Sequence, residues 1–183
     1  NIIVTGCAAQ IDPAMFASMP ETSAVVGNSD KYDAANFKLG LHSNLPDIRV
    51  SAIMQITETA PHMVSAFGDR SRAFVEIQNG CDHRCTFCII PFGRGNSRSV
   101  PAGLVVDQVQ ALVDKGFQEI VLTGVDVTSY GPDLPGQPTL GMLLVRILHH
   151  VPDLPRLRLS SLDGIEIDER LFDLLTGESR RMP

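Results

Sequence analysis

The spacing of apolar and polar residues changes along the chain from a strand-like to a helix-like period. Short apolar runs at 1–5 and 23–27 are typical of buried strands, and a helical stretch is expected between them at 13–19. A further helix is expected over 30–37, capped near Asn28 or Ser29. Alternation of strands and helices predicts a parallel α/β layer in this part of the chain.

The second part of the chain repeats a strand and helix three times. The expected elements are, in order, the strand 73–78, the helix 104–115, the strand 117–123, the helix 140–151, the strand 156–161 and a last helix capped by Asp168 and running through Leu175. In the first helix, Val105, Val109, Leu112 and Val113 lie on one face, and Gly116 follows in the usual C-terminal position. The order βαβαβα predicts a right-handed parallel barrel segment.

Between these two parts, 38–66 lacks clean periodicity and contains scattered glycine and proline. We expect a linker there, with one strand near 48–56. The predicted division is therefore a first domain with its linker at 1–66 and a second domain at 67–183. The predicted fold class is α/β, with the end of a parallel α/β domain followed by the first three βα units of a partial, TIM-like barrel.

Composition narrows the class of protein. The chain of 183 residues is 44% hydrophobic and 20% charged, with a mean hydropathy of +0.09, so it can bury a core. No apolar run reaches the roughly 18 residues that cross a bilayer, and no signal-peptide pattern opens the chain. The net charge of −6 does not favour RNA binding by this chain's own surface. We expect a cytoplasmic protein without a membrane segment.

Three cysteines, Cys81, Cys85 and Cys88, directly follow the first predicted barrel strand. Three thiolates can hold three irons of a [4Fe–4S] cluster and leave the fourth iron open, and an open iron can chelate the amine and carboxylate of S-adenosylmethionine. A zinc site normally closes with four ligands, and His83 lies between two of the cysteines, where chelation would be cramped. A zinc-stabilised binding module without redox chemistry remains the alternative from another class of function.

The flanks of these cysteines resemble a known family. The segments 67–80 and 91–99 are similar to those of the radical S-adenosylmethionine (radical SAM) methylthiotransferases, and the resemblance extends over 1–183. The segments 122–127 and 156–163 resemble the members that act on tRNA containing threonylcarbamoyladenosine. The resemblance implies addition of a 2-methylthio group to N6-threonylcarbamoyladenosine at position 37, next to the anticodon. Sister enzymes that act on isopentenyladenosine in tRNA or on a ribosomal-protein aspartate remain alternatives.

The resemblance also implies two [4Fe–4S] clusters. Cys81, Cys85 and Cys88 match the ligands of the cluster that binds S-adenosylmethionine. Cys7, in the run Val-Thr-Gly-Cys-Ala-Ala-Gln, matches one ligand of a second cluster, whose other two ligands would precede Asn1. Taken without the resemblance, Cys7 is most simply a buried and unreactive thiol.

Three further residues are candidate cofactor contacts on the same analogy. Phe87 is expected near the adenine of S-adenosylmethionine, and Asp126 and Ser161 follow the second and third barrel strands. Loops after parallel barrel strands gather on one face, so these loops and the cysteine loop should converge. On residue type alone, Asp126 could equally be a turn residue and Ser161 a strand-end hydroxyl.

The expected partners follow from the family. They are a tRNA substrate, bound through an RNA-binding module that this chain lacks, and an electron donor such as a flavodoxin or a ferredoxin. The chain is expected to be an internal fragment of the enzyme and inactive alone.

Overall fold

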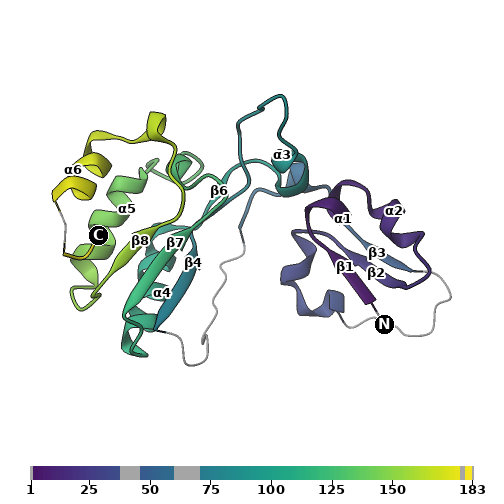
Figure 1. Cartoon of the computed structure of the whole chain (residues 1–183), viewed down its shortest axis with the longest axis horizontal. Coiled ribbons are helices and arrows are strands. Elements are labelled where there is room, and N and C mark those ends of the chain that lie inside the picture. Colours follow the sequence, from purple (N-terminus) through teal and green to yellow (C-terminus); the bar gives the residue numbers. More distant parts are fainter. Residues whose placement is uncertain (1, 38–45, 60–70, 178–179, 183) are drawn as a thin grey trace. The chain divides into compact units, whose positions relative to one another are not determined.

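The computed structural model describes residues 2–37, 46–59, 71–177 and 180–182. They pack as two compact units (Figure 1). Unit 1 comprises Asn1–Thr57 with Gly80–Asn96, and unit 2 comprises Glu58–Asn79 with Ser97–Pro183. The chain therefore enters unit 2, returns to unit 1 with the segment that carries the three clustered cysteines, and enters unit 2 again. The division expected after residue 66 lies outside the described residues and stays a prediction.

Unit 1 contains a three-stranded parallel sheet in the order β1-β2-β3. Its strands are β1 (Ile2–Thr5), β2 (Thr22–Val26) and β3 (Asp47–Arg49). Two short helices, α1 (Cys7–Ile11) and α2 (Pro13–Ala17), connect β1 to β2, and Asp12 caps α2 by accepting the Met15 N–H at 3.0 Å. Strand β2 lies in the middle, and its Ala24, Val25 and Val26 are fully buried. This sheet confirms the predicted parallel α/β layer.

The prediction of a helix over 30–37 is wrong. The segment forms two 3₁₀ turns, η1 (Asp30–Tyr32) and η2 (Ala34–Phe37). Asp33 between them is extended, with φ −92° and ψ 113°, and its carboxylate accepts the Ala35 N–H at 2.8 Å. A short acidic side chain that bonds the backbone two residues on competes with helical hydrogen bonding, which explains the interruption.

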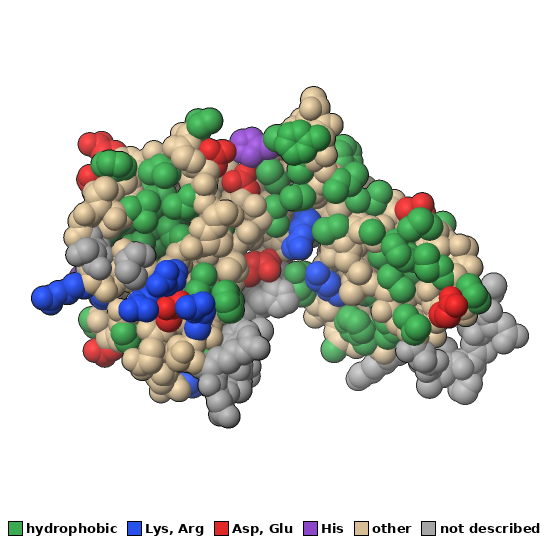
Figure 2. Space-filling model, viewed as in Figure 1, with side chains coloured by type: hydrophobic (Ala, Val, Ile, Leu, Met, Phe, Trp, Pro, Cys, Tyr) green, Lys and Arg blue, Asp and Glu red, His purple; other side chains and the backbone are tan. Residues whose placement is uncertain are grey.

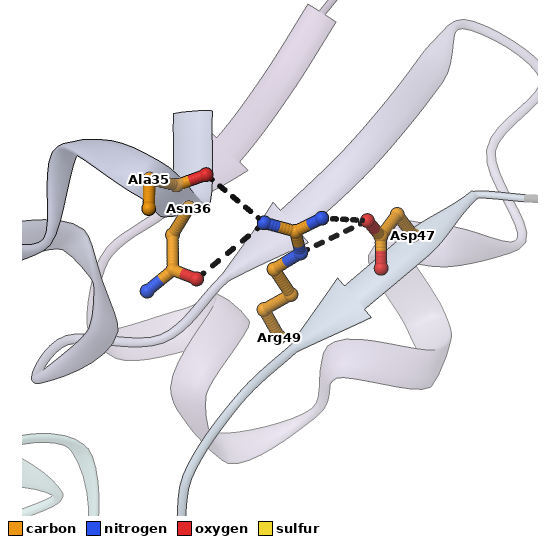
Figure 3. A network of polar contacts seen from close by, with 4 residues as sticks. All are labelled: Ala35, Asn36, Asp47 and Arg49. Carbon is orange, nitrogen blue, oxygen red and sulfur yellow. Dashed lines mark hydrogen bonds and ion pairs between the residues drawn. The ribbon is translucent and has the colours of Figure 1, made fainter. Parts of the chain in front are cut away.

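Arg49 fixes η2 against the edge strand β3 (Figure 3). Its Nη1 donates to the Ala35 carbonyl oxygen at 3.1 Å and to Asn36 Oδ1 at 3.5 Å, and its Nη2 lies 2.7 Å from Asp47 Oδ2. The strand expected over 48–56 is limited to β3, and a 3₁₀ turn, η3 (Ile53–Gln55), follows it.

Unit 2 is built on a three-stranded parallel sheet in the order β4-β7-β8 (Figure 1). Its strands are β4 (Arg72–Glu76), β7 (Glu119–Thr123) and β8 (Leu157–Leu159). The helices that follow them are α4 (Ala102–Asp114), α5 (Leu140–His150) and α6 (Glu169–Gly177), with the short turns η4 (Val127–Ser129) and η5 (Gly164–Glu166) after β7 and β8. The order confirms the predicted βαβαβα unit and the α/β fold class.

The strand expected over 73–78 is interrupted after Glu76. The next residues form β5 (Gln78–Asn79), which pairs antiparallel with β6 (Arg98–Ser99). This two-stranded ribbon is the point where the chain leaves unit 2 and returns to it, because the segment between its strands belongs to unit 1.

The main core lies in unit 2, between its strands and the inner faces of α4 and α5. Val105, Val109 and Leu112 of α4 are buried, as the helical spacing predicted. Asp168 caps α6 by accepting the Leu171 N–H at 2.7 Å, also as predicted. Among the described residues, no helix is both long enough and apolar enough to cross a bilayer.

One carboxylate at the start of β7 is surrounded by arginines. Glu119 is buried and forms ion pairs with Arg72, Arg156 and Arg158, the last two at 3.3 Å. Figure 2 shows basic side chains gathered around an acidic one in this unit. Burial alone would raise the pKa of Glu119, but the hydrogen bond from Arg156 and the charges of Arg72 and Arg158 outweigh it and hold the pKa below 4.5.

Candidate functional site

The three clustered cysteines lie on one loop of unit 1 that is closed at its base. Gly80 opens the loop with φ +78°, and a Cβ atom there would lie 1.9 Å from the Asn96 carbonyl oxygen. Only glycine fits this position without displacing the backbone. The Cys81 N–H then donates to the Gly95 carbonyl oxygen at 3.1 Å. The glycines on either side of the loop therefore let its two ends approach closely.

Arg84 stabilises the loop from within. Its Nη1 donates to the Cys81 carbonyl oxygen at 2.9 Å, and its Nη2 donates to Asn96 Oδ1 at 2.6 Å. The Cys88 N–H donates to the Cys85 carbonyl oxygen at 3.0 Å, which closes a turn between these two cysteines. All three thiols are thus held by one backbone segment.

The thiols fit an iron–sulfur cluster. None of the four cysteines forms a disulfide; Cys85 is exposed and the other three are half-buried. Three thiolates on one loop can each bind one iron of a [4Fe–4S] cluster, whereas a structural zinc site normally has four protein ligands.

Apolar side chains beside the thiols are exposed. Phe87 is 91% exposed, and Ile89 and Phe92 are more than half exposed. An exposed aromatic ring between two thiols has a free face on which a flat ring can stack. Phe87 is therefore available for the adenine contact expected from the sequence.

Cys7 is the first residue of α1, and it follows Gly6, whose φ is +116°. Its side chain lies against α3 (Ile90–Arg94), the helix that begins two residues after Cys88. A Cβ atom on Gly93 of α3 would lie 2.7 Å from the Cys7 Cβ and 3.3 Å from its Sγ. Within unit 1, the fourth cysteine thus lies next to the helix that ends the cysteine loop, although Cys7 and Cys81 are far apart in the sequence.

Asp126 lies where the backbone turns after β7. Its N–H and that of Val125 both donate to Gln78 Oε1, at 2.8 and 3.0 Å. The Gln78 side chain is fully buried, and its Nε2 donates to Ser97 Oγ at 2.9 Å. Gln78, which lies two residues before the first residue of the cysteine loop, therefore also fixes the backbone at Asp126.

The loops after β7 and β8 meet, as the parallel topology predicted. Thr128 Oγ1 accepts the Asp163 N–H at 2.9 Å, and Ser129 Oγ lies 2.8 Å from Glu166 Oε2. Ser161 is exposed at this edge. The neighbouring Ser160 hydroxyl is buried and has no hydrogen-bond partner among the described residues. Convergence of the cysteine loop with these two loops stays a prediction.

Sequence reasoning missed three polar residues of these sites: Asn28, Gln78 and Ser160. Gln78 carries a detectable signal, because two amide side chains directly after an apolar strand mark a change of structure. Ser160 is indistinguishable from Ser161 in the sequence alone. The sequence indicates only a helix cap near Asn28, whereas the structure places its amide beside Cys7.

Comparison with known proteins identifies the family. The model of the Radical SAM superfamily matches residues 75–174, which include the cysteine loop and most of unit 2. The chain belongs to the Radical SAM superfamily. This membership implies S-adenosylmethionine and a [4Fe–4S] cluster as cofactors, as expected from the cysteine spacing.

Curated relatives of this radical SAM chain are methylthiotransferases. It is 52% identical to the threonylcarbamoyladenosine tRNA methylthiotransferase MtaB of Rickettsia prowazekii, over all of the chain and 42% of that protein. It is 38% identical to the Bacillus subtilis enzyme of the same name, over 95% of the chain and 39% of that protein. The ribosomal protein uS12 methylthiotransferase RimO of Nostoc punctiforme is 35% identical, over 87% of the chain and 36% of that protein. The chain thus spans about two fifths of these relatives, and the predicted resemblance to methylthiotransferases is confirmed.

Proposed function

We propose that this chain is part of an enzyme that adds a 2-methylthio group to N6-threonylcarbamoyladenosine at position 37 of tRNA, next to the anticodon. The observation that carries the proposal is the 52% identity, over the whole chain, to a relative named for this tRNA nucleoside. Three cysteines outside any disulfide, on one loop of a radical SAM chain, support the same chemistry.

Cys81, Cys85 and Cys88 are the proposed ligands of the [4Fe–4S] cluster that binds S-adenosylmethionine. A cluster bound there would supply one-electron reduction of S-adenosylmethionine. The contribution of the chain would be to hold three thiolates on a loop fixed by Arg84, so that three protein ligands would serve a cluster of four irons.

Phe87, Asp126 and Ser161 are the proposed contacts of the bound S-adenosylmethionine. The exposed ring of Phe87 offers a stacking face for adenine. Asp126 is held by the hydrogen bond from its N–H to Gln78, and its carboxylate can accept a ribose hydroxyl or the amine of the methionine part. Ser161 and the buried hydroxyl of Ser160 lie at the end of β8 and can bond polar groups of the same ligand.

Cys7 is the proposed ligand of a second [4Fe–4S] cluster, with its other two cysteines supplied by sequence that precedes this chain in the enzyme. The relatives are more than twice as long as the chain, so such sequence is available in them. The enzyme would also contain the RNA-binding module, since this chain carries a net charge of −6. It would work in the cytoplasm and receive electrons from a flavodoxin or a ferredoxin.

A second candidate is methylthiolation of a ribosomal-protein aspartate, because a ribosomal protein uS12 methylthiotransferase is 35% identical over 87% of the chain. Deleting the gene and analysing tRNA nucleosides and uS12 peptides by mass spectrometry separates the two. We expect loss of the methylthio form of threonylcarbamoyladenosine, unchanged uS12, and recovery with the wild-type gene but not with Cys81→Ala. An unchanged nucleoside with an altered uS12 would replace the first candidate by the second.

A further inference from the structure

Asn28 joins Cys7 to the helix that follows the cysteine loop. Its side chain is 7% exposed, and Nδ2 lies 2.6 Å from the Gly93 carbonyl oxygen in α3 and 3.5 Å from Cys7 Sγ. An amide nitrogen carries two hydrogens, so one nitrogen can donate to both acceptors. All three residues belong to unit 1.

The orientation of the Asn28 amide is fixed by its neighbours. Lys31 Nζ lies 3.1 Å from Asn28 Oδ1, and an ammonium group can only donate, so the oxygen must face Lys31 and the nitrogen must face the sulfur. The Asn28 N–H donates to Gln10 Oε1 at 2.8 Å, and Gln10 Nε2 donates to the Ser51 carbonyl oxygen at 2.9 Å. Since Gln10 belongs to α1, the same helix as Cys7, the backbone of residue 28 is tied to the element that carries the thiol.

We propose that Asn28 is a positioning residue that sets the reduction potential of the second cluster through its hydrogen bond to the Cys7 sulfur. The proposal rests on the proposed function, in which Cys7 ligates that cluster. A hydrogen bond to a ligating thiolate stabilises the more negative, reduced state of a cluster and therefore raises its potential. Loss of this N–H donor lowers the potential.

The second hydrogen bond gives the same residue a geometric role. By donating to the Gly93 carbonyl oxygen, Asn28 holds α3 next to Cys7, and α3 begins two residues after Cys88. Asn28 thus sets the spacing between the ligand of one proposed cluster and the loop of the other. A merely structural amide would affect the stability of unit 1 and leave the potential of the second cluster unchanged.

The test uses the full-length enzyme in which Cys81, Cys85 and Cys88 are replaced by alanine, so that only the second cluster assembles. Its potential is measured by anaerobic redox titration followed by electron paramagnetic resonance, for the parent and for Asn28→Ala, Asn28→Asp and Lys31→Ala. The matched control is Asn36→Ala, whose amide donates to the Asp30 carbonyl oxygen instead of a thiol.

We expect Asn28→Ala to lower the potential, Asn28→Asp to lower it further because a negative charge replaces the donor, and Lys31→Ala to give a smaller shift in the same direction. Asn36→Ala should leave it unchanged. An unchanged potential in both Asn28 variants at full iron content overturns the proposal. Absence of any cluster in the parent would instead refute the role of Cys7, and loss of the cluster from Asn28→Ala alone, with wild-type folding, supports positioning.

Discussion

Gly93 lies so close to Cys7 that a Cβ atom on residue 93 would be 2.7 Å from the Cβ of the cysteine. Side chains essentially never approach at that distance, so α1 and α3 meet only because residue 93 has no side chain. This contact is the structural link between the N-terminal thiol and the segment that carries the other three.

Gly93→Ala is therefore expected to displace Cys7 or α3. Overpacking of this kind costs about 1–3 kcal/mol of unfolding free energy. In the full-length enzyme it should also reduce the iron bound at the proposed second cluster, because Cys7 can no longer take the position proposed for its ligand. Urea unfolding and iron analysis measure the two effects.

Gly103→Ala is the control for that substitution. Nothing lies within 4 Å of a Cβ atom at Gly103, which is in the first turn of α4. We expect its stability to be unchanged or raised by about 0.5–1 kcal/mol. Equal behaviour of the two alanine variants would contradict the close contact at Gly93.

Gln78→Ala is expected to weaken binding of S-adenosylmethionine. The substitution removes the acceptor of the Val125 and Asp126 N–H groups, which are partly buried, and a donor left unpaired there costs at most about 1–3 kcal/mol. If about 1.4 kcal/mol of this appears in binding, the dissociation constant rises tenfold. Equilibrium dialysis of the reconstituted enzyme measures it. As the control, Gln110→Ala on the exposed face of α4 should bind S-adenosylmethionine as the wild type does. Wild-type affinity of the Gln78 variant would contradict a role for Asp126 in binding S-adenosylmethionine.

Glu119 should make stability depend on pH. Its pKa is held below the ordinary value of 4.5, so the ionised form is favoured in the folded state. The resulting stability is present above pH 4.5 and is lost as the pH falls through the lower folded-state value. We expect Glu119→Gln to cost about 1–2 kcal/mol at pH 7, since the arginines are half exposed.

Urea unfolding from pH 7 to pH 3 checks that dependence. The difference in unfolding free energy between wild type and Glu119→Gln should shrink below pH 4.5. Asp153→Asn, an exposed carboxylate in the same unit, should show little difference at any pH. If the difference in unfolding free energy between wild type and Glu119→Gln were constant from pH 7 to pH 3, the ion pairs of Glu119 would not be its cause.

Tyr130→Phe tests a buried hydrogen bond in unit 2. Tyr130 is 2% exposed, and its hydroxyl donates to the Val100 carbonyl oxygen at 2.7 Å. Burial raises the pKa of Tyr130, so the hydroxyl stays protonated and can donate at every pH at which the protein is studied. We expect a loss of about 1–2 kcal/mol by chemical unfolding, because the carbonyl is left unpaired. A neutral result would mean that water replaces the hydroxyl.

The spacing of apolar residues was sufficient to predict the strands and helices of unit 2, because each of these elements buries an apolar face. Val105, Val109 and Leu112 mark α4, and Asp168 marks the start of α6, all by local rules. The prediction of a helix over 30–37 failed because the Asp33 carboxylate accepts a hydrogen bond from the Ala35 N–H, which competes with weak helical preference. The ribbon of β5 and β6 is non-local, since its strands are separated by the cysteine loop.

The candidate site was predictable where residue type alone limits the chemistry. Three thiols at fixed spacing point to a metal cluster wherever the loop lies. The amide of Asn28 and the buried amide of Gln78 could not be predicted, because their roles depend on contacts with Cys7 and Asp126 that only the fold creates. Ser160 and Ser161 both follow β8, and only the structure shows that the Ser160 hydroxyl is buried and that Ser161 is exposed.

The most direct test of the account is the metal content and spectrum of the enzyme after anaerobic reconstitution with iron and sulfide, with and without Cys85→Ala. We predict a coloured protein with a broad charge-transfer band, bound iron and sulfide, and a reduced-state resonance signal that changes when S-adenosylmethionine is added. Cys85→Ala should lose that response and keep the second cluster. A colourless protein with stoichiometric zinc, and no change on adding S-adenosylmethionine, would contradict the account.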